Sequence, residues 1–342
     1  MSIVERDEQL PIFREDAAWE DVQAALTERG LSDGLPLVPP TAHRLDRMLA
    51  DVSGPGRSFG MLPPMFGDLT PLSVAYCCLL AGCVPAELPV VMTAAVACQE
   101  PDFNLLGLLT TTGTPAVATM VHGPIARTLG MNSGTNCLGP GNRANASIGR
   151  AMSLVLRNIA GAVEQTGDMA TMGQPGKYGC CFAESDGGLL PPLAERRGLA
   201  PGASAVTVFG VSGTMEVLPL DERDSPAAIL TPIALAMSAT GAAASAGKQR
   251  QLGEQVVLMP PEVLEKLRDL GCSLADIQAF LFEAEQASIP GIASLQREQP
   301  IATSASSIVP IETGGPGIKM TCLPLWAGSS ISQPLPVLDL SR

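Results

Sequence analysis

Residues 131–184 constrain the fold of this 342-residue chain more strongly than any other stretch. Two loops of the Pro-Gly type, 139–143 and 173–177, enclose a segment in which apolar residues recur at the spacing of one helix face. These apolar residues are Ile148, Met152, Val155 and Ile159. Because positions i, i+4, i+7 and i+11 fall on one side of an α-helix, the pattern predicts a helix over residues 145–161 that packs one face against a core.

Four loops share one short pattern, a Pro-Gly pair followed within two residues by Arg or Lys. Three of them are called the first loop (139–143), the second loop (173–177) and the third loop (314–319), and the remaining one is residues 54–57. Proline fixes its own φ and glycine accepts positive φ, so such turns can point successive backbone N–H groups into one concavity that suits an anion. A basic side chain close by can then cover the anion. Ordinary surface turns are the alternative, because the chain contains 35 Gly and 30 Pro.

The loop at 139–143 leads directly into the N-terminus of the predicted helix, where unpaired N–H groups and the helix dipole favour an anion. Neither GxxxxGK[ST] nor GxGxxG is present, so the sequence predicts a small molecule bearing a carboxylate or phosphate rather than a nucleotide. Amide and hydroxyl side chains in this stretch can orient a carboxylate or stabilise an oxyanion. The predicted substrate-binding residues are Asn132, Ser133, Asn136, Gly139, Gly141, Asn142, Arg143, Asn145, Gly176, Glu184, Gly315 and Gly317.

The cysteines and lysines near these loops are candidates for the chemistry. Cys180 and Cys181 follow Lys177 closely, and Cys322 follows Lys319 in the same way. A nearby cation and backbone N–H groups lower the pKa of a thiol and so favour the nucleophilic thiolate. The two adjacent cysteines would point to opposite faces of a strand, so only one of them could enter a site. The alternative is that these cysteines are small buried hydrophobic residues.

An acid or base is the other kind of candidate. His122 precedes Gly-Pro at the end of a predicted strand, where α/β folds place functional residues; local packing is the alternative. Glu184 can act as an acid or base or lie at a solvated strand end, and Cys137 is a further candidate thiol. The predicted catalytic residues are Cys180, Cys181, Lys177, His122, Cys322 and Lys319. With two histidines and no Cys-x-x-Cys, the sequence predicts no metal site and no cofactor.

Segments typical of strands alternate with segments typical of helices, which predicts an α/β fold. A strand, a helix and a Pro-Gly-Lys loop running into a Cys-bearing segment occur twice. The two sets are 115–121, 145–161 and 173–182, and then 203–210, 226–246 and 314–323. This echo predicts two similar half-domains, a pseudo-repeat with a site between their Gly-Pro-Gly loops. The predicted divisions are an N-terminal segment at 1–60, a first lobe at 61–200 and a second lobe at 201–342.

Charge and hydropathy exclude several classes of partner. The formal net charge of −13 argues against non-specific binding to nucleic acid. The N-terminus is acidic and lacks the apolar run of a signal peptide, and the uncharged stretches 72–86 and 225–247 are too short or too weakly apolar to span a bilayer. Nine cysteines at scattered spacing fit a reducing compartment. We therefore expect a cytoplasmic protein without membrane contact, and the small-residue helix at 226–246 makes a homo-oligomer plausible.

Five segments carry a resemblance to a known family: DGLPLVPPT (33–41), NSGTNCLGPGNRANASIGRA (132–151), GQPGKYGCCFAE (173–184), SAVTVFG (204–210) and GGPGIK (314–319). They resemble a bacterial family associated with the UGSC-type (seleno)proteins, which are named for a selenocysteine- or cysteine-Gly-Ser-Cys motif. The resemblance covers most of the chain. It implies a cytoplasmic α/β protein that works with a small partner bearing a thiol or selenol. This chain has no Cys-Gly-Ser-Cys of its own, so that chemistry would come from another subunit.

Three functions follow as hypotheses. The first is an enzyme that acts on a small anionic substrate held by the Gly-Pro-Gly loops, with cysteine or Lys/His acid–base chemistry, as a lyase, a hydrolase or a thiol-dependent reductase. The second is a non-catalytic subunit that completes the active site of a thiol- or selenol-bearing partner. The third is a small-molecule binding protein. An activated thiol favours the first, activity only on adding a second chain favours the second, and affinity without turnover favours the third.

Overall fold

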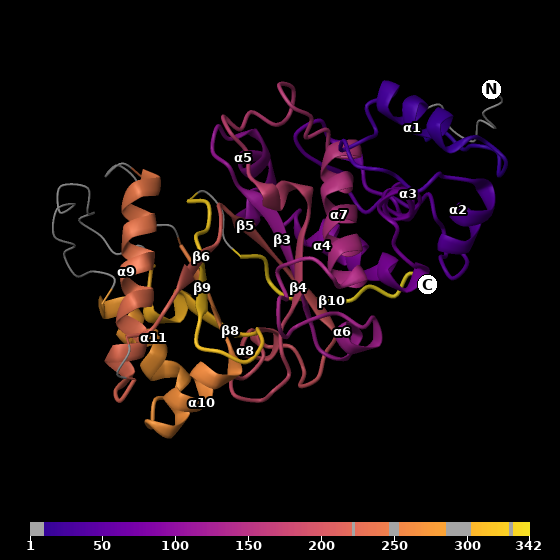
Figure 1. Ribbon diagram of the computed structural model, residues 1–342. Coiled ribbons are helices and arrows are strands. Elements are labelled where there is room, and N and C mark those ends of the chain that lie inside the picture. Colours follow the sequence, from indigo (N-terminus) through magenta and orange to yellow (C-terminus); the bar gives the residue numbers. More distant parts are fainter. Residues whose placement is uncertain (1–9, 221–222, 246–252, 285–301, 328–330) are drawn as a thin grey trace.

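The computed structural model describes residues 10–220, 223–245, 253–284, 302–327 and 331–342. Two four-stranded mixed sheets lie face to face at its centre, and helices cover the outer face of each sheet (Figure 1). The chain therefore forms four layers, in the order helices, sheet, sheet, helices. The α/β class predicted from the sequence is confirmed.

The two sheets have the same pattern of strand directions. The first sheet has the order β10-β5-β3-β4, with β3 (Ala116–His122), β4 (Cys180–Ala183), β5 (Ala205–Val211) and β10 (Leu335–Pro336). The second has the order β6-β9-β7-β8, with β6 (Met215–Val217), β7 (Gln255–Met259), β8 (Ile308–Glu312) and β9 (Met320–Leu323). In both orders the first two pairs are antiparallel and the last pair is parallel. A two-stranded hairpin, β1 (Met61–Leu62) and β2 (Gly67–Asp68), stands apart from them.

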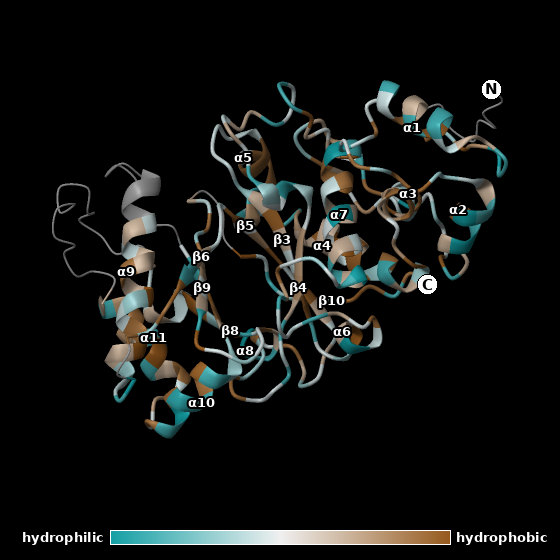
Figure 2. Cartoon of the chain, viewed as in Figure 1, coloured by the Kyte–Doolittle hydropathy of each residue, from teal (hydrophilic) through white to brown (hydrophobic). Residues whose placement is uncertain are grey.

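The core between the sheets explains the long apolar runs of the strands. Every residue of β3, β5 and β7 is buried, because one face of each strand packs on helices and the other on the opposite sheet. Side chains of both sheets form one cluster, in which the rings of Phe182 and Phe209 lie 6.3 Å apart between centroids. The central strands therefore read as continuous hydrophobic segments rather than as alternating ones (Figure 2).

The helices divide between the two outer faces. The first sheet is covered by α3 (Pro71–Ala81), α4 (Leu88–Ala97) and α7 (Arg143–Asn158), and the second by α9 (Pro226–Ser245), α10 (Pro261–Asp269) and α11 (Leu274–Ala284). The shorter helices are α1 (Trp19–Glu28), α2 (Ala42–Met48), α5 (Leu105–Thr110), α6 (Pro124–Thr128) and α8 (Leu193–Arg196). The 3-10 turns are η1 (Pro85–Glu87), η2 (Pro101–Phe103), η3 (Pro175–Tyr178) and η5 (Ala305–Ser307). The helix predicted over 145–161 is confirmed as α7, whose buried face includes Ile148, Met152 and Val155.

The helix predicted over residues 226–246 is confirmed as α9, which spans 20 residues and contains Pro232. It packs against α11 and the second sheet. Among the helices in the described ranges, none combines the length and the apolar character needed to cross a lipid bilayer.

The strands connect the sheets in a way that the sequence echo did not predict. Residues 203–210, assigned to the second set, form most of β5, which pairs with β3 in the first sheet over seven residues. The next strand, β6, lies in the second sheet, whereas β10, which follows β9, returns to the edge of the first. β6 thus follows β3, β4 and β5 along the chain but pairs in the second sheet, and β10 follows β7, β8 and β9 but pairs in the first.

Candidate functional site

A groove of about 720 Å³ lies where the second Pro-Gly loop meets the first sheet. Its lining comes from residues 173–178, the start of β3, the C-terminal half of α7 and the segment 162–172. Because β3 begins at Ala116 and η3 directly precedes β4, the groove lies at the amino ends of these two parallel strands. The volume is in the range of small-molecule sites.

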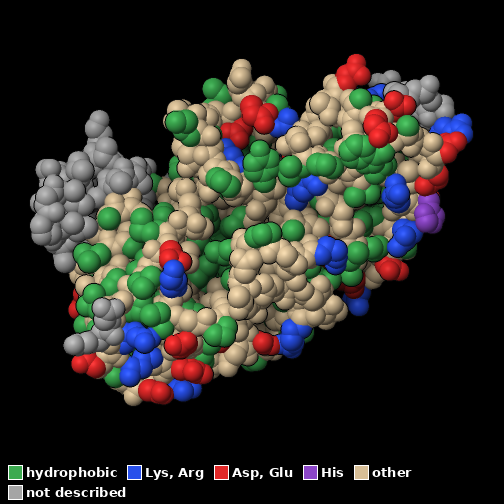
Figure 3. All heavy atoms as spheres, viewed as in Figure 1, with side chains coloured by type: hydrophobic (Ala, Val, Ile, Leu, Met, Phe, Trp, Pro, Cys, Tyr) green, Lys and Arg blue, Asp and Glu red, His purple; other side chains and the backbone are tan. Residues whose placement is uncertain are grey.

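Two ion pairs line this groove. Lys177 Nζ lies 2.5 Å from Asp168 Oδ2, and both side chains are about a quarter exposed or less. Arg157 Nη1 lies 2.9 Å from each carboxylate oxygen of Glu164 and lowers the pKa of Glu164 below its ordinary value. Figure 3 shows acidic and basic side chains together at the top of the molecule, over the coil that follows α7 in Figure 1. The groove therefore offers two cationic groups that carboxylates already hold in place.

The loop that carries Lys177 is fixed to the sheet by Gln174. The Nε2 group of Gln174 donates to the carbonyl oxygens of Thr114 and Val211, at 2.8 and 2.6 Å. These two residues lie just before β3 and at the end of β5, so one side chain joins both strands to the loop. The predicted residue Gly176 lies in the same loop. The hydrogen bonds of Gln174, and not the turn alone, therefore fix the position of the loop that carries Lys177.

Asp33, the first residue of the Pro-rich segment 33–41, lines the groove. Asp33 accepts two hydrogen bonds from Arg150, at 2.8 and 2.9 Å, and Arg150 also donates to the carbonyl oxygens of Leu35 and Pro36. Burial alone would raise the pKa of Asp33, but the hydrogen bonds from Arg150 and the Leu35 N–H outweigh it, so the pKa is below its ordinary value. Arg150 therefore ties the extended segment to α7.

Replacing Asp33 with asparagine is expected to lower the free energy of unfolding at pH 7 by about 2 kcal/mol, because Arg150 loses its charged partner. Since the folded-state pKa of Asp33 is depressed, its contribution is present above the unfolded-state pKa, near about 4, and is lost as the pH falls through the folded-state pKa. Urea denaturation at neutral pH and at about pH 2.5 measures the difference. A difference that persists in acid, or an equal loss in Asp51→Asn on the exposed surface, contradicts this account.

The third Pro-Gly loop meets residues 133–135, which precede the first loop, at the opposite end of the strands. Gly314 N–H donates to the Ser133 carbonyl at 2.8 Å, and Thr313 Oγ1 contacts the carbonyl oxygens of Ser133 and Ala183 at 3.1 and 3.0 Å. A Cβ at Gly315 would overlap Thr135. The third loop and the segment before the first loop thus lie together after β3 and β8, while the loop of Lys177 precedes β4 at the other end.

Polar side chains in and around the first loop form hydrogen bonds with the backbone of the same stretch. Asn145 Oδ1 accepts from Asn132 N–H at 3.0 Å, and its Nδ2 donates to the carbonyl oxygens of Asn132 and Cys137. Asn142 caps α7 through Asn145 N–H, and Asn136 Nδ2 donates to the Pro140 carbonyl. The predicted residues Gly139 and Gly141 lie in the first loop, and Gly317 lies in the third. These amides therefore set the path of the loop.

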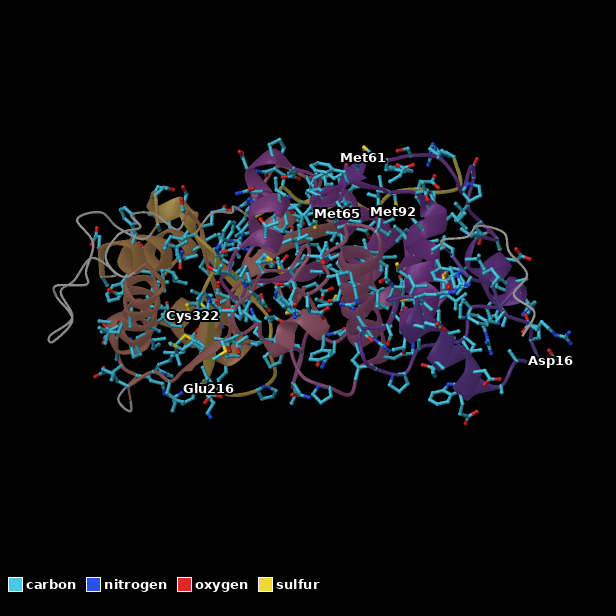
Figure 4. The ribbon with its side chains drawn as sticks, turned by 90° about the horizontal axis from the view of Figure 1, so that it is seen from above. Asp16, Met61, Met65, Met92, Glu216 and Cys322 are labelled. Carbon is cyan, nitrogen blue, oxygen red and sulfur yellow. The ribbon has the colours of Figure 1, made fainter. Side chains whose placement is uncertain are left out.

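Arg143, the basic residue of the first loop, faces a buried carboxylate. Its Nη1 lies 2.8 Å from Glu87 Oε1, and Ser147 Oγ donates to Glu87 Oε2 at 3.1 Å. Lys319, at the third loop, pairs with Glu216 at 2.7 Å on the exposed surface. Figure 4 shows Glu216 on the same side of the molecule as Cys322, at the second sheet. Each predicted basic residue is thus already in an ion pair.

His122 lies inside the fold and both of its ring nitrogens are engaged. Nδ1 lies 2.6 Å from Glu184 Oε2, and Nε2 lies 2.7 Å from Thr207 Oγ1. Glu184 also accepts from Leu193 N–H, and Arg196 lies 3.9 Å away. The histidine is 1% exposed, so a substrate in the groove does not reach it. This placement favours the packing alternative for His122.

The predicted cysteines pack among apolar residues, with Cys181 and Cys322 buried and Cys180 partly exposed. Cys181 packs in the core beneath the helices, whereas Cys180 packs between the sheets, so the two thiols point to opposite faces as expected. Burial raises the pKa of Cys180 to about 11 and that of Cys322 to about 12, and it also raises the pKa of Cys181. Cys137 is buried and contacts Thr313 Oγ1 at 3.6 Å. Protonated thiols at neutral pH favour the alternative that these cysteines are core residues.

Sequence reasoning found Lys177 but missed Arg157, Glu164 and Asp168. The sequence offers no clear signal for them, because the four charged residues of 157–177 are spread without a regular spacing. Across the described ranges, no group of three or more His, Cys, Asp or Glu side chains is arranged to hold a metal ion. The chain matches no protein-family model, and no curated protein is significantly similar to it. Function is therefore argued from the geometry of the groove.

Proposed function

We propose that the chain is an enzyme that binds a small carboxylate- or phosphate-bearing substrate in the groove, with Lys177 and Arg157 as its cationic contacts. One observation carries this proposal: a groove of about 720 Å³ contains two basic side chains, each hydrogen-bonded to a carboxylate. Such an arrangement is pre-organised, because the side chains are ordered before the ligand arrives. The first Pro-Gly loop does not line this groove, and its basic residue Arg143 is paired with the buried Glu87.

The chemistry proposed is proton transfer by Lys177 and Asp168. An entering anion takes the place of Asp168 at the Lys177 ammonium, which leaves the Asp168 carboxylate free to accept a proton from the substrate. Lys177 then acts as the proton donor to the group that leaves. This acid–base route suits a lyase or a hydrolase. It is favoured over a thiol route because burial keeps Cys180, Cys181 and Cys322 protonated.

Replacing Lys177 with alanine is expected to weaken binding of such anions by roughly ten- to hundred-fold, the loss of one charge-assisted contact. Titration calorimetry with a panel of small mono- and dicarboxylates and inorganic phosphate identifies the ligand class. Lys319→Ala is the matched control, because it removes an exposed, carboxylate-paired lysine at the other end of the strands. Equal affinities in the two variants, or no binding of any member to wild type, count against the groove as an anion site.

The alternative function rests on the rim of the groove. Met169, Met172 and Tyr178 line it and are 48%, 89% and 57% exposed. Exposed methionine and tyrosine side chains are adaptable contacts for another protein. We therefore propose, as the second candidate, a cytoplasmic subunit whose groove receives a thiol- or selenol-bearing partner of the UGSC type. Turnover that appears only when such a partner is added supports it, and turnover by the chain alone excludes it.

We further propose that the two sheets and their helices form an internal repeat. The equal strand directions support this idea, with β3, β4 and β5 corresponding to β7, β8 and β9. Glu184 and Glu312, at the ends of β4 and β8, are both buried and both accept backbone N–H groups from residues 189–193. The correspondence differs from the echo in the sequence, and a homo-oligomer formed through α9 stays a proposal beside it.

A further inference from the structure

The C-terminus of α3 places two cysteines against each other. Gly82 has a φ of +87°, its N–H donates to Leu79 at 3.0 Å, and Cys83 N–H donates to the Cys78 carbonyl at 2.9 Å. These two bonds define a Schellman motif, which brings the side chains three positions before and two positions after the helix end into contact. Here both of those side chains are cysteines.

The two thiols differ in access to solvent. Cys78 is fully buried, at the position of the motif that lies opposite Cys83. Cys83 is partly exposed. Cys77, the neighbour of Cys78 in α3, and Cys181 in β4 are buried as well.

We propose that Cys78 and Cys83 form a reversible disulfide and that Cys83 is the thiol through which oxidation enters. The Cys83 thiolate attacks one sulfur of a small disulfide such as oxidised glutathione, and the first glutathione thiolate leaves. The Cys78 thiolate then attacks the Cys83 sulfur, which releases the second glutathione. Two thiol protons and two electrons thus pass to the small disulfide, which departs as two thiols.

The pair Cys78 and Cys83 lies outside the groove, in the helix layer that covers the first sheet. α3 packs extensively on α7, the helix that carries Arg150 and Arg157. Glu87 lies beneath Arg143 at the start of α7 and accepts a hydrogen bond from the N–H of Val84, the residue after Cys83, at 3.0 Å. A bond between Cys78 and Cys83 would therefore form next to the contacts that seat the first Pro-Gly loop.

The chain contains its own control for this chemistry. At the end of α10, Gly271 has a φ of +75°, its N–H donates to Arg268, and Cys272 N–H donates to the Leu267 carbonyl at 2.9 Å. Cys272 thus occupies the same position of a second Schellman motif and is also partly exposed. The residue opposite it is Leu267, which offers no thiol. Cys272 can hold a glutathione adduct but cannot pass it to a neighbour.

The test is equilibration of the full chain in a glutathione redox buffer, followed by acid quenching and peptide mass spectrometry. The expected product is an internal disulfide between Cys78 and Cys83, with a glutathione adduct on Cys272. The adduct on Cys83 should be roughly ten-fold less abundant than that on Cys272, since the neighbouring thiol competes at high effective concentration. Fractions are compared at equilibrium, because partial burial and the nearby Asp276 raise the pKa of Cys272 and slow its reaction.

In Cys78→Ala, the adduct on Cys83 should rise to the level on Cys272. The proposal is overturned if Cys83 in the wild-type chain keeps its adduct as Cys272 does, if Cys83 stays reduced throughout, or if it links to Cys77 or Cys181. Far-UV circular dichroism checks that the variant folds. Should it fail to fold, the comparison of Cys83 with Cys272 in the wild-type chain decides the outcome by itself.

Discussion

Replacing His122 with alanine is expected to lower the free energy of unfolding by about 4 kcal/mol. The change removes the shared partner of two buried hydrogen bonds and leaves the Glu184 carboxylate and the Thr207 hydroxyl without it inside the fold. It also leaves a cavity at the end of β3, where the surroundings are closely packed. Urea denaturation monitored by circular dichroism, with wild type and variant at the same pH, measures this loss.

His43→Ala provides the control, because His43 is exposed and its replacement should change stability by less than about 0.5 kcal/mol. A catalytic His122 would behave differently: the variant would keep its stability and lose turnover. A stable His122→Ala chain would therefore refute the structural role and restore the acid–base hypothesis for this residue.

The second large effect is expected at Gly123, directly after His122. Its φ of +74° and ψ of −161° lie in a region that is essentially restricted to glycine, and a Cβ would overlap the Ala203 carbonyl. Gly123→Ala should therefore destabilise the fold by about 3 kcal/mol, as backbone strain adds to the steric conflict. Thermal and urea unfolding both report it, and a lowered midpoint with an unchanged slope indicates loss of stability without a change in compactness.

Gly130→Ala separates these two causes. Gly130 also has a positive φ, +65°, but no atom lies within 4 Å of a Cβ built there. Its replacement carries only the backbone cost, about 1 kcal/mol. If both alanine variants lose the same stability, the contact between Gly123 and Ala203 contributes nothing and the close approach of these segments is looser than the structure indicates.

Local patterns in the sequence were enough to predict the elements with strong periodicity. The apolar face of α7 and the apolar run of β3 were recognised because spacing and burial are encoded within each segment. The partners of the strands were not, since pairing depends on residues far apart in the chain. Residues 203–210 stand in the second set of the sequence echo, whereas β5 pairs with β3 of the first set; the strand itself is confirmed.

The residues of the candidate site were likewise predicted only in part. The loop of Lys177 carries a visible signal, a Pro-Gly turn followed by a rare lysine. Asp168 carries none, because the segment 162–172 is irregular and charges in such a segment have no period. Arg157 is one of three arginines in α7, and nothing in the sequence singles it out. Whether Lys177 and the first loop belong to one site also depended on strand direction, which places them at opposite ends of β3 and β4. Sequence spacing cannot supply that distance.

The late position of β10 along the chain has a consequence for synthesis. The edge strand of the first sheet is residues 335–336, whereas its other strands are complete by residue 211 and all strands of the second sheet lie in between. Until residues 335–336 leave the ribosome, the first sheet keeps an open edge at β5. The last hydrogen bonds of the first sheet therefore form only after the strands of the second sheet have emerged.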